Sequence, residues 1–207
     1  MAADKKTALD LGAHICFEDE TGQGLRAPKG RTWARRGERP VVRVRGANRG
    51  RVSVAGVVCF RPGHRSRLFY KLHVYRGRRN EPKSLSWRDY RDLIVMTHPQ
   101  LGTPVVWVWD NLSVHLRQEL ADFAEEHSDW LRVFHLPSYA PELNPQEHIW
   151  SLLKRYLADF AAADLSHLVR VMKRKLKKLQ YRPDLIDGCL AGTGLIIEAA
   201  PDTTSST

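Results

Sequence analysis

Three acidic residues, Asp19, Asp110 and Glu147, occupy positions where a carboxylate could do chemistry. Asp19 lies inside an apolar β pattern, Asp110 directly follows the apolar run VVWVW at 105–109, and Glu147 falls in the first turn of a helix expected to begin near Asn144. A charge beside an apolar strand is costly to desolvate unless it has a partner. Mg²⁺ and Mn²⁺ prefer oxygen ligands of this kind, so three such acids converging on one cleft would predict a divalent-metal site.

Each acid also has a purely structural explanation. Asp110, followed by Asn111, can start a turn and cap the next helix. Glu147 stands at the third helical position, where a glutamate folds back on the cap and suits the helix dipole. Asp19 can pair with one of the many arginines. Because the three acids belong to a strand interior, a strand end and a helix start, their convergence is the stronger interpretation.

The alternation of side chains along the expected strand 14–20 places its acidic residues on two different faces. Residues two apart share a face of a strand, which puts Asp19 with the apolar Ile15 and Phe17. Glu18 and Glu20 fall on the opposite face and are weaker candidates.

Hydrophobic patterning predicts a mixed α/β domain. The expected strands are 14–20, 40–46, 51–60, 67–75, 105–109 and 131–136. The expected helices are 87–98 (capped by Ser86 and ended by Pro99), 114–127, one beginning after Asn144, and 165–179. Antiparallel strands followed by alternating strands and helices predict a mixed sheet flanked by helices, with ligand sites at the carboxyl ends of the parallel strands.

The charge balance favours a polyanionic partner. The chain has 33 Lys and Arg against 23 Asp and Glu, and a pI near 9.8. The excess is clustered at 26–51, 61–91 and 170–182, as expected for contact with a phosphate backbone, although a well-solvated surface explains it equally. No apolar run could span a membrane, no signal peptide is recognisable and no C-x-x-C pair occurs, so we expect a cytoplasmic protein without structural zinc or disulfides.

Four segments carry a family resemblance. FEDETG, RTWARRGERP, VVWVWDNLSVH and LPSYAPELNPQEHIWSLLK occur in that order. Together they resemble the DDE transposases of the Tc/mariner superfamily, and specifically the bacterial insertion-sequence branch called the six-thirty group. The resemblance extends over roughly residues 13–160, and the last segment is long enough to be specific.

This resemblance implies an RNase H-like fold and a catalytic, metal-binding triad of Asp19, Asp110 and Glu147. It implies two Mg²⁺ or Mn²⁺ ions, cleavage of DNA at transposon ends, and strand transfer by the freed 3′-hydroxyl into target DNA. Carboxylates sharing two ions should lie on the order of 4–8 Å apart. A homodimer is also implied.

The DNA contacts expected from the family pattern, helix position or charge are Arg31, Trp33, Arg35, Arg36, His115, Lys154, Lys173 and Lys177. His115 could instead orient Asp110 or be an ordinary hydrogen-bonded histidine, and Lys154 could simply be solvated. Trp150 is more simply explained as a core residue.

The expected organisation is a flexible end at 1–12, a catalytic domain at 13–182 with a basic loop at 21–40, and a C-terminal extension at 183–207 whose end is disordered. Family members carry an N-terminal helix-turn-helix region with no counterpart here. A separate upstream helix-turn-helix polypeptide, a truncated relic and a misplaced start are the open explanations. The functional alternatives are an inactive DNA-binding remnant and another RNase H-like nuclease. A bacterial, nucleoid-associated location follows from the transposase interpretation.

Overall fold

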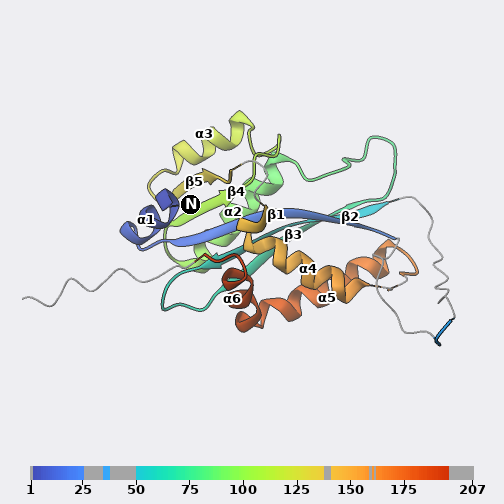
Figure 1. Ribbon diagram of the computed structural model, residues 1–207. Coiled ribbons are helices and arrows are strands. Elements are labelled where there is room, and N and C mark those ends of the chain that lie inside the picture. The colour runs from blue at the N-terminus through green and yellow to red at the C-terminus, as the bar shows by residue number, and fades with distance from the viewer. Residues whose placement is uncertain are drawn as a thin grey trace, which may run out of the picture.

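The computed structural model describes residues 2–25, 35–37, 50–137, 141–158, 160 and 162–195 (Figure 1). The strands are β1 (His14–Gly24), β2 (Arg51–Phe60), β3 (Arg67–Tyr75), β4 (Val105–Trp109) and β5 (Leu131–His135). The helices are α1 (Ala2–Asp10), α2 (Trp87–Leu101), α3 (Gln118–Glu126), α4 (Pro145–Leu157), α5 (Leu165–Gln180) and α6 (Pro183–Ala191), with a 3-10 turn η1 (Pro141–Leu143) before α4.

The five strands form one mixed sheet in the order β3-β2-β1-β4-β5. β1 pairs antiparallel with β2, and β2 with β3, whereas β1 and β5 both run parallel to β4. The predicted sequence of antiparallel strands followed by parallel strands is therefore confirmed. The predicted strand 40–46 lies outside the described residues.

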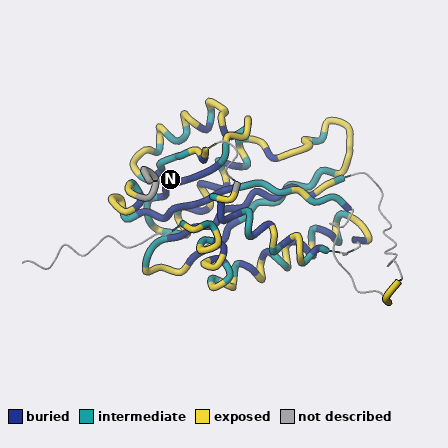
Figure 2. Tube along the Cα trace, viewed as in Figure 1, coloured by how far each residue is buried: buried dark blue, intermediate teal, exposed yellow. Residues whose placement is uncertain are grey.

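Helices cover both faces of this sheet (Figure 2). β2 and β4 are buried along nearly their whole length, β1 is buried in its first half, and the edge strands β3 and β5 are mostly half-buried. Ile15 and Phe17 of β1 pack in the core beneath α4, α5 and α6, whereas Cys16 packs in the core on the α2 side. The alternation expected for β1 is thus present. Burial on both faces explains why β4 consists only of apolar residues.

The structure differs from the expected elements at both ends of the chain. Residues 2–10, expected to be flexible, form α1, and Ala8 is buried against the sheet core. α6 lies within the expected C-terminal extension, but Ile186 and Cys189 join the same core as α4. The extension is therefore part of the domain as far as the described residues reach.

Two helix boundaries were predicted wrongly. Pro99 does not end α2, which continues to Leu101 and ends at Gly102 in the left-handed conformation. A proline in the last turn removes only one backbone hydrogen bond there. α3 begins at Gln118 rather than near residue 114, because turns occupy the chain before it.

None of the helices in the described part of the chain is both long and apolar enough to cross a membrane.

Candidate carboxylate site

Asp19 and Asp110 extend from adjacent parallel strands at equivalent positions. The ladder between β1 and β4 ends at the pair Phe17 and Val108. Asp19 lies two residues after Phe17, and Asp110 lies two residues after Val108. Phe17 and Val108 both face the α4 side of the sheet. Strand alternation therefore directs Asp19, and Asp110 as it leaves β4, toward that side.

The first turn of α4 brings Glu147 to the same place. Asn144 caps α4 by accepting from the Gln146 amide, and its Nδ2 donates to the Glu18 carbonyl of β1 at 2.9 Å. The helix start is thus hydrogen-bonded to the residue beside Asp19. Glu147 occupies the third helical position, as the sequence predicted.

Gly56 of β2 permits this close approach. It lies directly opposite Asp19 in the β1–β2 ladder. A Cβ at this position would lie 2.6 Å from the Trp150 ring and 2.7 Å from Gln146 Nε2. α4 therefore lies directly against the strand pair that carries Asp19, and only a glycine fits beneath it.

Electrostatics couple the three acids. Burial, the Glu147 carboxylate and then Asp110 raise the pKa of Asp19 from 3.8 to about 7, while the Glu20 backbone amide and the Trp150 indole act in the opposite direction. Asp19 Oδ2 is buried and has no hydrogen-bond partner among the described residues. A buried carboxylate oxygen facing like charges is the environment that a cation would relieve.

Asp110 is held differently and keeps its charge. His115 Nδ1 lies 2.8 Å from Asp110 Oδ1, and the Leu112 amide donates to the same oxygen at 3.0 Å. The bond from His115 is the main reason that the pKa of Asp110 lies below its ordinary value. Half of the Asp110 side chain remains exposed.

Two further acids on β1 were underrated by the sequence analysis. Glu18 is fully buried on the α2 side, with its Oε2 3.3 Å from His115 Nε2, and burial followed by the neighbouring charge of Asp19 raises its pKa well above the ordinary value. Glu20 accepts a hydrogen bond from the Tyr90 hydroxyl at 2.7 Å. Alternation placed both side chains correctly, but nothing in the sequence indicated that His115 or Tyr90 would meet them.

The described residues contain no group of three or more His, Cys, Asp or Glu side chains arranged closely enough to hold a metal ion. Asp19, Asp110 and Glu147 lie on the α4 side of the sheet and interact electrostatically, but their side chains do not form a preformed metal-binding site. All-oxygen donors and the unpartnered Asp19 oxygen nevertheless suit Mg²⁺ or Mn²⁺.

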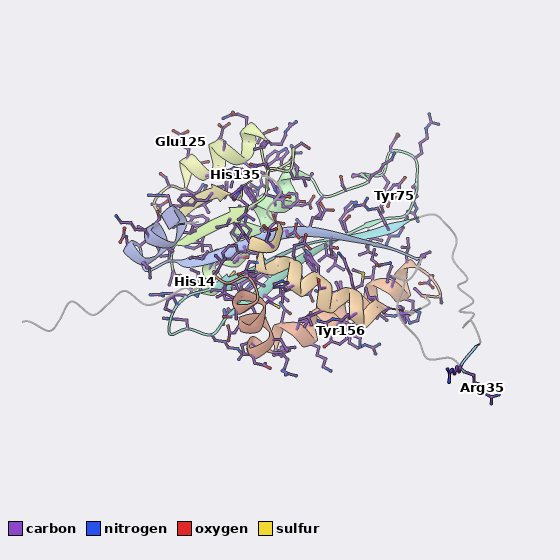
Figure 3. All side chains as sticks on the ribbon, viewed as in Figure 1. His14, Arg35, Tyr75, Glu125, His135 and Tyr156 are labelled. Carbon is purple, nitrogen blue, oxygen red and sulfur yellow. The ribbon has the colours of Figure 1, made fainter. Side chains whose placement is uncertain are left out.

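The residues expected to touch DNA differ in their exposure to solvent. Arg35, Arg36, Lys154, Lys173 and Lys177 are exposed, and Arg35 is labelled in Figure 3. His115 is only 4% exposed and contacts acids rather than solvent, so a direct DNA contact does not fit it. Arg31 and Trp33 lie outside the described residues.

The fold matches known structures. A pre-cleavage Mos1 transpososome superposes with a TM-score of 0.57 and 16% sequence identity, over 95% of this chain and 60% of that chain. The Mos1 transposase paired-end complex with left transposon end gives 0.56 and 16%, over 95% and 62%. The Mos1 mariner paired-end complex with Mn gives 0.55 and 15%, over the same shares. The chain thus spans about three fifths of the transposase chains it matches, and no curated protein sequence is significantly similar to it.

The order of the strands and the flanking helices define an RNase H-like fold, as predicted. The family model described as DDE superfamily endonuclease matches residues 14–169, more than half of the chain. The protein belongs to the DDE superfamily endonucleases.

Proposed function

We propose that the chain is the catalytic domain of a transposase, which cleaves DNA at transposon ends and joins the freed 3′-hydroxyl to target DNA. The observation that carries this proposal is the electrostatic coupling of Asp19 to both Glu147 and Asp110 on one face of a DDE-type fold. Burial is the largest cause of the raised pKa of Asp19, and the charges of Glu147 and Asp110 add to it because these carboxylates lie near Asp19. We also assign the chain to the bacterial six-thirty branch of the Tc/mariner superfamily, on the segments that carry the resemblance.

In this proposal Asp19, Asp110 and Glu147 would hold two divalent ions, Mg²⁺ or Mn²⁺. When bound, such ions stabilise the attacking and the leaving oxygen of an in-line displacement at phosphorus. Asp19 lies between the other two acids in its interactions and is the natural shared ligand. Attack by water cleaves the strand, and attack by a 3′-hydroxyl joins it to the target, so no nucleophilic side chain is required.

The partners follow from the same proposal. The solved structures that the fold matches include transposase complexes with a transposon end. For this chain we infer transposon ends and target DNA as substrates, and a homodimer as the working unit. We include among the partners a helix-turn-helix polypeptide that recognises the element ends, on the family resemblance alone.

Cleavage of a labelled element-end duplex in Mg²⁺ or Mn²⁺ tests the proposal. We expect the wild-type chain to nick the duplex and Asp110→Asn to lose on the order of 100-fold or more in rate. Asparagine keeps an oxygen that can accept from His115, so this variant removes the charge while the fold is retained. Exposed Asp129→Asn serves as the matched control and should cleave like wild type.

Two results would contradict the proposal. Equal cleavage by wild type and Asp110→Asn would remove Asp110 from the chemistry. Absence of cleavage by wild type, with the upstream helix-turn-helix segment supplied in trans, would identify an inactive DNA-binding remnant.

A further inference from the structure

His115 is fixed on every side that the structure describes. Its ring stacks on Trp109 with centroids 4.6 Å apart and planes 3° apart, and it meets the Tyr90 ring edge-on at 4.7 Å. These contacts hold the imidazole plane in one orientation. The two ring nitrogens consequently point in defined directions, one at Asp110 and the other at Glu18.

The side chain of Glu18 has no other hydrogen-bond or ion-pair partner among the described residues. Both of its carboxyl oxygens are buried without a hydrogen bond of good geometry, and the nearest polar group is His115 Nε2 at 3.3 Å. Burying a carboxyl group in this way is costly, and a leucine would fill the same space without that cost. The placement therefore has a reason beyond packing, and among the described residues His115 is the one group of opposite polarity in ion-pair contact with the Glu18 carboxyl group.

The contact on the other side of the ring reaches Asp110. Oδ1 of Asp110 accepts from both His115 and the Leu112 amide, which fixes the plane of the carboxylate. No described residue donates to Oδ2. Carboxylates that ligate metals are commonly held by such an outer layer of hydrogen bonds.

We propose that Glu18 and His115 are positioning residues for Asp110: buried Glu18 holds His115, and His115 holds the Asp110 carboxylate with one oxygen left for a metal ion. This inference rests on the proposed function, since it assigns Asp110 to metal binding. For His115 it selects the alternative of orienting Asp110 over a DNA contact, because His115 and Glu18 are both buried. Their effect on chemistry passes entirely through Asp110.

Binding of Mn²⁺ alone to the full chain, followed by electron paramagnetic resonance of the free ion, provides the test. His115→Phe keeps the stacking on Trp109 but cannot donate to Asp110, and we expect its affinity for Mn²⁺ to fall about tenfold. His115→Asn retains a donor toward Asp110 and should keep most of the affinity. Glu18→Leu should weaken binding in the same direction as His115→Phe, and Glu18→Gln should weaken it less.

His64→Ala is the matched control. His64 is exposed, and its Nδ1 lies 3.1 Å from the Pro62 carbonyl. Its removal should leave the affinity for Mn²⁺ unchanged. Circular dichroism and thermal melting establish that each variant is folded.

A second measurement uses the wild-type chain and requires no variant to fold. Nitrogen-15 spectra of the histidine side chains, without metal, should show a proton on Nδ1 of His115. A bare Nδ1 would overturn the proposal, as would equal Mn²⁺ affinity in wild type and folded His115→Phe. Failure of DNA cleavage by the wild type would instead contradict the proposed function, and it would leave these metal-binding results intact.

Discussion

Burial and the neighbouring carboxylates of Glu147 and Asp110 raise the pKa of Asp19 from 3.8 to about 7. The unfolded chain releases this proton near pH 4, whereas the folded chain keeps it until about pH 7. Between these values the folded state binds more protons than the unfolded state, so stability decreases as pH rises. Above pH 7 the full penalty remains, at most about 4 kcal/mol since one pKa unit corresponds to about 1.4 kcal/mol.

Asp19→Asn should remove this penalty. Without metal, we expect the variant to be more stable than wild type at pH 8 and close to it at pH 4, because asparagine carries no charge at either pH. Thermal denaturation in EDTA at the two pH values measures the difference.

Added Mn²⁺ provides the complementary comparison. The ion should raise the melting temperature of wild type at pH 8, because a ligand that binds the folded state stabilises it. It should have much less effect on Asp19→Asn. A wild-type melting temperature that does not change between pH 4 and pH 8 would contradict a raised pKa of Asp19 in the folded state.

At the scale of elements, the position of α4 against β1 and β2 decides whether Glu147 faces the aspartates. Asn144 connects the helix start to the Glu18 carbonyl, and Trp150 and Gln146 lie over Gly56. The absence of a side chain at Gly56 is thus a requirement of the site as well as of the core.

Gly56→Ala should displace α4 and weaken the site. The added methyl group would lie within 3 Å of Trp150 and Gln146, and overpacking of this kind typically costs about 1–3 kcal/mol. We expect a lower free energy of unfolding, measured in urea, together with weaker Mn²⁺ binding.

Gly188→Ala is the control for this change. Gly188 lies within α6 and has open space where its Cβ would be. Alanine there should leave stability unchanged or increase it by up to about 1 kcal/mol. Equal effects of the two substitutions would show that the α4 contact does not constrain the site.

The sequence predicted where β1 and α4 lie and which way their side chains face, but it did not predict the contacts between residues far apart in the chain. Alternation placed Asp19 and Glu18 on opposite faces of β1, and Asn144-Pro145 predicted the start of α4, because both features depend on local backbone geometry. The contact of Glu18 with His115 joins residues far apart in the chain, and the start of α4 meets Gly56 across the sheet. Such contacts depend on sheet order and helix packing, which periodicity does not encode.

At the scale of the whole molecule, positive charge is concentrated on α5. Its exposed cations are Arg170, Lys173, Arg174, Lys177 and Lys178. In the described part of the chain none of them forms an ion pair. Lys175, on the same helix, lies over the Tyr156 ring of α4, with Nζ 4.8 Å from the ring centroid. A row of unpaired cations on one helix suits the phosphate backbone of a duplex.

DNA affinity should depend on this helix and on salt. With Lys173 and Lys177 both replaced by alanine, we expect weaker binding and a slope of log affinity against log salt that is smaller by about two, since each phosphate contact contributes about 0.9. Lys6→Ala on α1 is the control and should leave the slope unchanged. Fluorescence anisotropy between 50 and 200 mM salt, roughly the range over which such contacts are lost, measures both quantities.

Slopes that do not differ between the double variant and wild type would assign the DNA surface to another part of the molecule. The basic segment itself was evident from composition, but its exposure was not. Acidic residues of a neighbouring element could have neutralised the same lysines and arginines. Only the packing of α5 against β2, β3 and α4 shows which of these cations face solvent.

The parallel ladder that ends at Phe17 and Val108 has a mechanical consequence. Both aspartates follow the last residue pair of a buried, hydrogen-bonded strand ladder. The distance between them can therefore change little unless the hydrogen bonds of that ladder break. Glu147 is attached differently, because α4 meets the strands through side-chain packing and the Asn144 hydrogen bond rather than through a strand ladder. In the proposed transposase, adjustment of the site to different DNA intermediates would therefore come from Glu147, while the separation of the two aspartates stays constant.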